Sequence, residues 1–111
     1  MITVLKLVFI FTTLFCSLAD PAPLLTYPID INGNKIRVEV ANTEKLRKLG
    51  LMHRKKLSEN AGMIFVYDTA RVTAMWMKNT LIPLSVAFVD GDGVIINIEK
   101  MEPLDLTPHK S

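Results

Sequence analysis

Residues 29–40 have the sequence IDINGNKIRVEV, and this stretch decides the fold class. Apolar and polar residues alternate on both sides of Asn32-Gly33, a pair that favours the two-residue turn of a β-hairpin. In the second half, charged residues separate Ile36, Val38 and Val40, so the apolar side chains fall on one face of a strand. The stretch therefore predicts a hairpin that rests one face on a core.

Directly after the hairpin, the spacing of the apolar residues changes from the alternation of a strand to the spacing of a helix. Thr43 is a favourable N-cap, and the pattern predicts a short helix over residues 44–49 with Leu46 and Leu49 on its apolar face. Gly50 suits the exit of that helix because glycine tolerates the backbone conformation required there. The sequence thus predicts one helix of about two turns.

The second half of the chain alternates short apolar runs with turn residues. Asp90-Gly91-Asp92-Gly93 is typical of a hairpin turn, and the tail from Glu102 carries two prolines and predicts no element. The runs predict strands at residues 63–67, 72–77, 84–89 and 94–98. The fold class is therefore mainly β, a compact antiparallel barrel or sandwich with one short helix.

Residues 1–19 differ from the remainder of the chain. Lys6 precedes an apolar run of about a dozen residues, and Ser17-Leu18-Ala19 offers small residues before a cut at Asp20. The run is shorter than the ~20 apolar residues of a spanning helix, which disfavours a retained anchor. Phe15 likewise disfavours a lipid anchor on Cys16. We expect a cleavable signal peptide, export to the periplasm or outside, and no membrane anchor afterwards.

Cleavage would leave a lead-in at residues 20–28 and one domain at residues 29–111. Residues 20–111 together carry 12 basic and 11 acidic residues. Their charge therefore gives no support to binding of nucleic acid or an anionic membrane surface. The only cysteine, Cys16, would leave with the signal peptide, which excludes disulfides and thiolate chemistry in the remaining chain.

Two stretches carry a resemblance to a known family. They are GLMHR at residues 50–54, followed by GMIFVY at 62–67, and MWMKNTLIPL at 75–84. Over about residues 29–103 the chain resembles the DUF192 family, also called UPF0127, small and often exported domains of unknown biochemical function. The resemblance implies a β-rich fold and export, and it supplies no catalytic residues.

Family members generally continue beyond the position of Ser111 with further strand-like sequence. The resemblance therefore implies that the domain lacks the family's C-terminal strands. A missing strand would leave an open sheet edge, which favours a homodimer or a partner chain.

We call GLMHR at residues 50–54 the first motif and MWMKNTLIPL at residues 75–84 the second motif. The second motif also suggests a binding site. On a strand, Met75 and Met77 would face the core, while Trp76 and Lys78 would face the opposite way. An indole platform, a point charge and an amide suit a polar or anionic small ligand such as a sugar or a carboxylate, which an arginine could hold at two points. The predicted ligand site comprises Arg54, Trp76, Lys78, Asn79 and His53.

Other functions remain open at this stage. A structural or protein-interaction domain would use the open sheet edge. Thioether and imidazole groups suit reduced copper, and Met75, Met77 and His53 are the residues that such a site would use. An enzyme is less favoured, because no serine stands in a nucleophile-elbow sequence, and no cofactor is implied. The hypothesis that we carry forward is a non-catalytic binding module.

Overall fold

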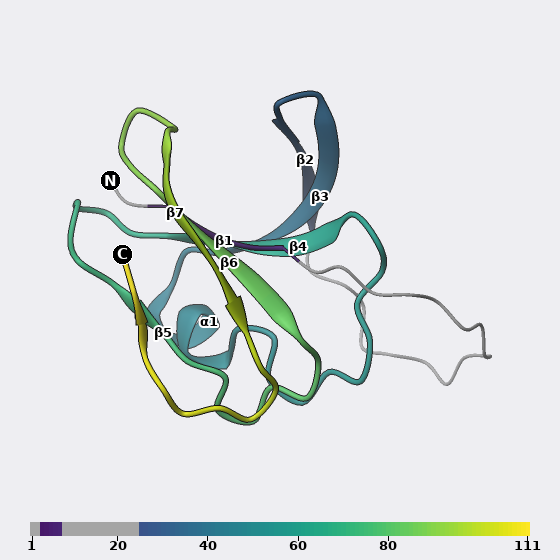
Figure 1. Ribbon diagram of the computed structural model, residues 1–111. Coiled ribbons are helices and arrows are strands. Elements are labelled where there is room, and N and C mark those ends of the chain that lie inside the picture. Colours follow the sequence, from purple (N-terminus) through teal and green to yellow (C-terminus); the bar gives the residue numbers. More distant parts are fainter. Residues whose placement is uncertain (1–2, 8–24) are drawn as a thin grey trace.

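The structure is a computed structural model that describes residues 3–7 and 25–111 (Figure 1). Within these ranges the chain is rich in strands and has a single short helix, so the predicted β-rich class is confirmed. The elements are β1 (Thr3–Leu7), β2 (Thr26–Ile31), β3 (Asn34–Ala41), α1 (Glu44–Leu49), β4 (Ala61–Val66), β5 (Ala74–Met75), β6 (Leu84–Val89), β7 (Ile95–Met101) and β8 (His109–Lys110).

The predicted hairpin is confirmed as β2 and β3. The two strands pair antiparallel, from Thr26 opposite Glu39 to Ile31 opposite Asn34. Asn32 and Gly33 form the turn with φ values of 50° and 85°, which asparagine and glycine tolerate better than other residues. The Gly33 amide also donates a hydrogen bond to Asp30 Oδ1 at 2.7 Å, which closes the turn.

One sheet contains six strands in the order β2-β3-β4-β1-β6-β7, and a second sheet joins β5 to β8. The sequence predicts antiparallel pairing, and β3 with β4 is the exception, since these strands run parallel. Parallel neighbours need a crossover connection, and the segment from Asn42 to Asn60, which contains α1, supplies it. The helix therefore lies over the sheet because it belongs to this crossover.

Helix α1 begins and ends where the sequence predicts. Thr43 Oγ1 accepts a hydrogen bond from the Leu46 amide at 3.2 Å, and the Gly50 amide donates to the Leu46 carbonyl at 2.9 Å. Leu46 packs on the core, whereas Leu49 is 49% exposed, so the predicted apolar face is only partly buried. Leu49 therefore lies largely on the surface.

The sheet has apolar clusters on both faces. β4 and β6 place Met63, Phe65, Val86 and Phe88 in the main cluster. The smaller cluster is centred on Ile36, Val38 and Ala87. Ala41, Leu51, Tyr67, Met75, Met77, Ile82, Leu84 and Met101 complete the main cluster. The interior strands are therefore covered on both sides.

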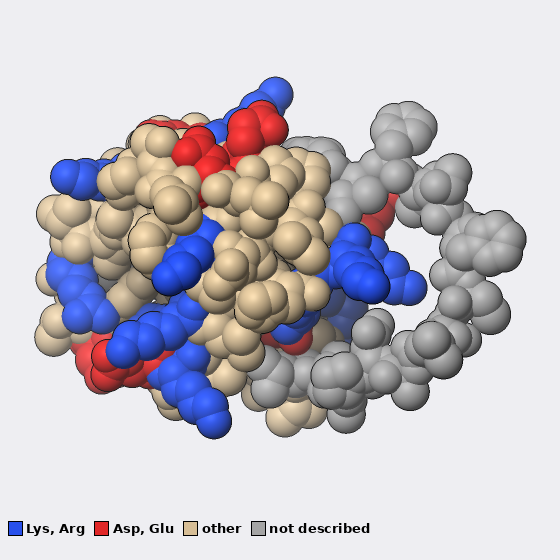
Figure 2. Space-filling model, turned by 90° about the horizontal axis from the view of Figure 1, so that it is seen from below, with Lys and Arg blue, Asp and Glu red and all other residues tan. Residues whose placement is uncertain are grey.

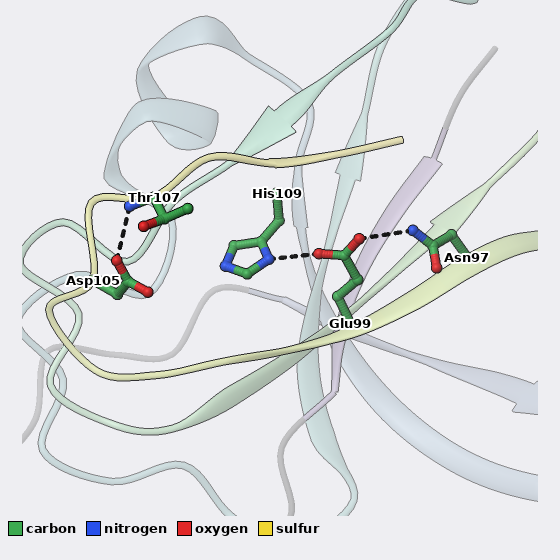
Figure 3. A network of polar contacts seen from close by, with 5 residues as sticks. All are labelled: Asn97, Glu99, Asp105, Thr107 and His109. Atoms are coloured by element: carbon green, nitrogen blue, oxygen red, sulfur yellow. Dashed lines mark hydrogen bonds and ion pairs between the residues drawn. The ribbon is translucent and has the colours of Figure 1, made fainter.

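The C-terminal segment, which the sequence leaves without an element, is fastened along residues 73–80. β8 pairs with β5 through Met75 opposite His109, and the Met77 amide donates to the Asp105 carbonyl at 2.9 Å. His109 Nδ1 lies 2.5 Å from Glu99 Oε2, and the Asn97 amide donates to Glu99 Oε1 at 3.0 Å (Figure 3). These contacts tie the segment to β7.

Three strand predictions differ from the structure in extent. The strand predicted at 63–67 begins and ends earlier, as β4 at Ala61–Val66. The predicted strand at 72–77 is reduced to Ala74–Met75, and β7 is longer than predicted and begins and ends later, at Ile95 and Met101. β6 matches its predicted bounds. The two-residue strand is short because only β8 pairs with it.

β1 lies in the interior of the large sheet, between β4 and β6 (Figure 1). It runs antiparallel to both, with Val4 opposite Phe65 on one side and opposite Phe88 on the other. These residues belong to the predicted signal peptide, while the predicted cleavage position before Asp20 lies outside the described residues. In the described ranges, no helix has the length and apolar character needed to cross a membrane.

Candidate functional site

A cleft of about 730 Å³ lies between α1 and the segment that carries the second motif. This volume falls in the range of ~300–1,000 Å³ that is usual for small-molecule sites. Figure 2 views the molecule from below, where Lys and Arg side chains stand at several places on the surface. The cleft is lined by Glu44, Arg47, Lys48, Leu49, Gly50, Met52, Tyr67, Arg71, Ala74, Met75, Trp76, Lys78, Asn79 and Thr80.

Two guanidinium groups lie over the same aromatic ring in this cleft. Tyr67 follows β4 and is 9% exposed. The Arg47 guanidinium lies 5.0 Å from the ring centroid, and that of Arg71 lies 4.4 Å from it. Both distances are within the ~6 Å of a cation–π contact. Arg47 also donates from Nη1 to the Val66 carbonyl at 2.9 Å, which fixes its position at the end of β4.

The second motif forms the opposite part of the lining. Trp76 is 46% exposed, and Lys78 Nζ lies 5.3 Å from its ring centroid. A turn closed by a hydrogen bond from the Thr80 amide to the Met77 carbonyl, at 3.1 Å, follows the tryptophan. Asn79 takes a φ of 52° in this turn, a left-handed conformation that asparagine adopts more readily than most residues. The predicted residues Trp76, Lys78 and Asn79 therefore line one cleft.

The lining has four basic side chains and one acidic side chain. The acid is Glu44, whose Oε1 lies 2.9 Å from Lys48 Nζ on the exposed side of α1. The hydrogen bond and the charge of Lys48 hold the pKa of the Glu44 carboxyl below its ordinary value. Among the described residues, no ion pair neutralises Arg47, Arg71 or Lys78, so the cleft carries a local positive charge.

Arg54 is the predicted site residue that the fold does not bring to the cleft. Its Nη1 and Nη2 donate to the two carboxylate oxygens of Glu39, at 2.5 Å and 3.0 Å. Glu39 is only 5% exposed on β3, and a buried carboxylate needs such a partner. Arg54 lines a separate hollow of about 490 Å³ instead, together with Leu57 and residues 58–62. We therefore interpret Arg54 as a structural residue.

His53 contributes to the site through its backbone. Its amide donates to the Asn79 carbonyl at 2.8 Å, while its side chain is exposed and does not line the cleft. The φ of His53 is 64°, so the chain turns sharply between α1 and Arg54. This bond joins the first motif to the second and supports the turn that presents Lys78 and Asn79.

The methionines named for copper serve the core. Met77 is fully buried and Met75 is 8% exposed, and both belong to the main cluster, as the alternation along the second motif predicts. The His53 side chain is exposed, whereas Met77 is buried. In the part of the chain that the structure describes, no group of three or more His, Cys, Asp or Glu side chains is placed to hold a metal ion.

Sequence reasoning missed Arg47, Tyr67 and Arg71. They come from α1, from the end of β4 and from the segment before β5, so no single motif contains them. Two sequence signals point to them: the basic character of α1, which is more often typical of a solvated helix face, and the place of Tyr67 at the end of the stretch GMIFVY. Their grouping arises from the crossover that places α1 beside the end of β4.

The fold and cleft define a small β-rich protein with one crossover helix and a basic, aromatic-lined cleft. The chain belongs to the DUF192 family, described as "Uncharacterized ACR, COG1430", whose family model matches residues 27–111. This confirms the family that the two motifs indicate. The family description assigns no biochemical activity.

Two solved structures are similar to this chain. A protein of unknown function from Novosphingobium aromaticivorans DSM 12444 is 32% identical with a TM-score of 0.78, over 86% of this chain and 71% of that chain. A "putative transcription regulator" from Sinorhizobium meliloti 1021 is 36% identical with a TM-score of 0.68, over 69% of this chain and 60% of that chain. No curated protein matches the chain significantly.

Proposed function

We propose that this protein is a non-catalytic binding module that holds a small anionic ligand in the cleft between α1 and the second motif. The observation that supports the proposal is the charge of the cleft. Arg47, Arg71 and Lys78 stand around two aromatic rings and take part in none of the ion pairs of the described residues, although the charge of Glu44 in the same lining acts on Arg47 and Arg71. An anion entering there would meet donors rather than displace an internal ion pair.

The lining favours a ligand with a carboxylate or phosphate at one end and a flat or sugar-like body. A guanidinium can bind two oxygens of such a group at once, and Arg47 and Arg71 offer two guanidinium groups close to the same ring. The half-exposed ring of Trp76 provides the apolar platform on which a ring or a sugar face would stack. Lys78 and Asn79 add a charge and an amide at that end of the cleft.

Ligand binding by purified protein tests the proposal. Thermal-shift and calorimetric titrations would compare sugar phosphates, uronic acids and aromatic carboxylates with the corresponding neutral sugars and amides. We expect the anions to raise the melting temperature and the neutral analogues to leave it unchanged. A hydrogen bond to a charged group contributes about 1.5–3 kcal/mol, so Arg71→Gln should weaken binding about tenfold or more.

Matched variants separate the cleft from general charge. Trp76→Ala and Lys78→Ala should also weaken binding, whereas Lys55→Gln removes an exposed cation outside the lining and should leave it unchanged. If no anion stabilises the wild type, or if Lys55→Gln weakens binding as much as Arg71→Gln, the proposed function is wrong.

The proposal places this binding protein in the periplasm or outside the cell. Its support is the basic start, apolar run and small-residue exit of residues 1–19. N-terminal sequencing of protein recovered from the exported fraction checks this point. We expect the recovered chain to begin at or near Asp20, and a chain that begins at Met1 would contradict export by cleavage.

A further inference from the structure

The interior position of β1 has a direct structural consequence. β1 pairs with β4 and with β6 over five residues on each side, from Thr3 to Leu7. The strand order gives β4 and β6 no pairing with each other, since β1 stands between them. Without β1 the large sheet would separate into a β2-β3-β4 part and a β6-β7 part with two facing edges.

The residues of β1 are also the start of the predicted signal peptide. Once residues 1–19 are cleaved and lost from the protein, the processed chain presents the two facing edges. Backbone amide and carbonyl groups that lose their partners in a buried setting are costly, and unpaired edges accept strands from other chains.

We propose that the β1 position is a strand-acceptor site, which an extended segment of another polypeptide fills in the processed protein. The incoming strand runs antiparallel to both β4 and β6, as Thr3–Leu7 does in the structure. The inference rests on the proposed removal of residues 1–19 and is independent of the ligand cleft.

The register defines the chemistry of the incoming strand. One of its residues comes to stand between Phe65 and Phe88, and the residue two positions further stands between Met63 and Val86. All four side chains are at most 1% exposed and belong to the main cluster. The partner therefore presents apolar side chains at these two alternate positions, and it has no proline at its centre, because both edges bond to it.

The intact chain provides the first test. Leu5→Pro removes an amide from the strand that pairs with both β4 and β6, and we measure backbone hydrogen exchange along the chain. Exchange should rise at least about tenfold in β4 and β6 while the β2–β3 turn region stays unchanged, and Lys55→Pro in an exposed loop should not reproduce this pattern. Unchanged exchange in β4 and β6 would overturn the proposal.

Strand exchange provides the second test. A recognition sequence for a specific protease is inserted after Ala19, and the folded, purified protein is cut there. A fluorescent peptide with the sequence of residues 1–8 is then added, and its anisotropy and the exchange of β4 and β6 are followed. We expect saturable binding of one peptide per chain, with renewed protection of both strands.

Peptide variants test the register. A peptide with Lys6→Leu should bind about tenfold tighter, since position 6 pairs with Met63 on one side and with Val86 on the other, and both belong to the main cluster. Peptides with Leu5→Pro, or with the same residues in scrambled order, should not bind. The proposal is overturned if the cut chain binds none of the peptides, or if the proline and scrambled peptides bind as well as the original. Anion binding in the cleft is measured separately, so failure of either proposal is distinguishable.

Discussion

Burial of a carboxylate is unfavourable unless a cation and further hydrogen bonds replace its water. Glu39 meets this requirement through a two-point contact with Arg54, whose side chain is itself only 33% exposed. The pair links β3 to the segment that leaves α1, and so it closes the crossover between the two parallel strands. Arg54 thus helps to hold the frame of the cleft without touching the cleft.

We predict that Arg54→Met strongly destabilises the protein. It leaves the Glu39 carboxylate buried without its cation, and removal of one partner of such a pair costs about 3–5 kcal/mol. Urea unfolding followed by circular dichroism measures the free energy of unfolding. The exposed neighbour Lys55→Met serves as the control and should change it by less than about 0.5 kcal/mol.

The double variant Glu39→Met/Arg54→Met sharpens this prediction. It removes both charges from the buried site, so it should recover a large part of the stability lost in the single variant. A double variant as unstable as Arg54→Met alone would mean that packing, rather than the uncompensated carboxylate, causes the loss.

We also predict that Gly50→Ala destabilises the protein by about 1–3 kcal/mol. Gly50 has φ 49° and ψ −130°, a conformation that residues with a Cβ atom rarely adopt. A Cβ atom there would also lie 3.3 Å from Phe65 Cζ. Gly93→Ala is the matched control, because it has a φ of 81° with no atom within 4 Å of an added Cβ. Thermal unfolding should give the larger loss for Gly50→Ala.

The burial of Glu39 also shows a limit of predicting side-chain exposure from the alternation of apolar and polar residues. The alternation in residues 36–40 predicts that Glu39 faces solvent, and the structure buries it. β3 lies between β2 and β4, and near its end the smaller cluster covers one face while the main cluster covers the other. Alternation identifies one covered face, but it cannot identify the position at which both faces become covered.

Elements with local signals were predictable from the sequence. The hairpin, α1 and β6 follow from a turn pair, a capping residue and an apolar run, each contained in a short stretch. β5 and β8 depend on pairing between residues more than thirty positions apart, and β1 depends on two distant strands. The same difference applies to the cleft. The sequence predicts site residues within the second motif, whereas Arg47, Tyr67 and Arg71 come together only in the folded chain.

The contact between β7 and the C-terminal segment predicts a pH dependence of stability. The hydrogen bond from His109, followed by that from Asn97, holds the pKa of the Glu99 carboxyl below its ordinary value of 4.5. A carboxyl whose pKa is lower in the folded chain binds protons more weakly there than in the unfolded chain. Its stabilising contribution is therefore present above pH 4.5 and is lost as the pH falls through the folded value.

We predict that acid loosens the C-terminal segment and that Glu99→Gln abolishes part of this response. The free energy of unfolding of the wild type should fall on acidification below about pH 5, and that of Glu99→Gln should fall less steeply. Urea unfolding at a series of pH values measures both slopes. Asp92→Asn, at an exposed turn, should retain the slope of the wild type, and equal slopes for Glu99→Gln and the wild type would contradict the prediction.

The net charge of the whole molecule does not explain the positive charge of the cleft. The full chain has 13 basic and 11 acidic residues, so its net charge of +2 is small. The positive charge of the cleft is a local product of topology, because the crossover puts α1 next to the segments that carry Arg71 and Lys78. Screening by salt acts over ~10 Å at 0.1 M, so a small anion would respond to this local group rather than to the average surface.

At the scale of the whole molecule, the main cluster should govern cooperative unfolding. Phe88 is fully buried near the end of β6, and the cluster joins the large sheet to the segments around α1 and β5. We predict that Phe88→Ala costs about 3–5 kcal/mol, through lost burial and the cavity that remains. This is a large part of the ~5–15 kcal/mol that stabilises a typical domain, so the variant should be partly unfolded near 37 °C.

The smaller cluster gives the comparison for this prediction. Ile36 is 8% exposed on the other face of the sheet, and Ile36→Val removes one methylene group, for which we expect a cost of about 0.5–1.5 kcal/mol. Denaturant unfolding should give one transition for each variant with the same dependence on urea concentration as the wild type, if both clusters unfold together. A separate early transition in Ile36→Val would contradict this expectation and would show that the β2–β3 hairpin unfolds on its own. In that case the parallel pairing of β3 with β4 does not couple the hairpin to the main cluster.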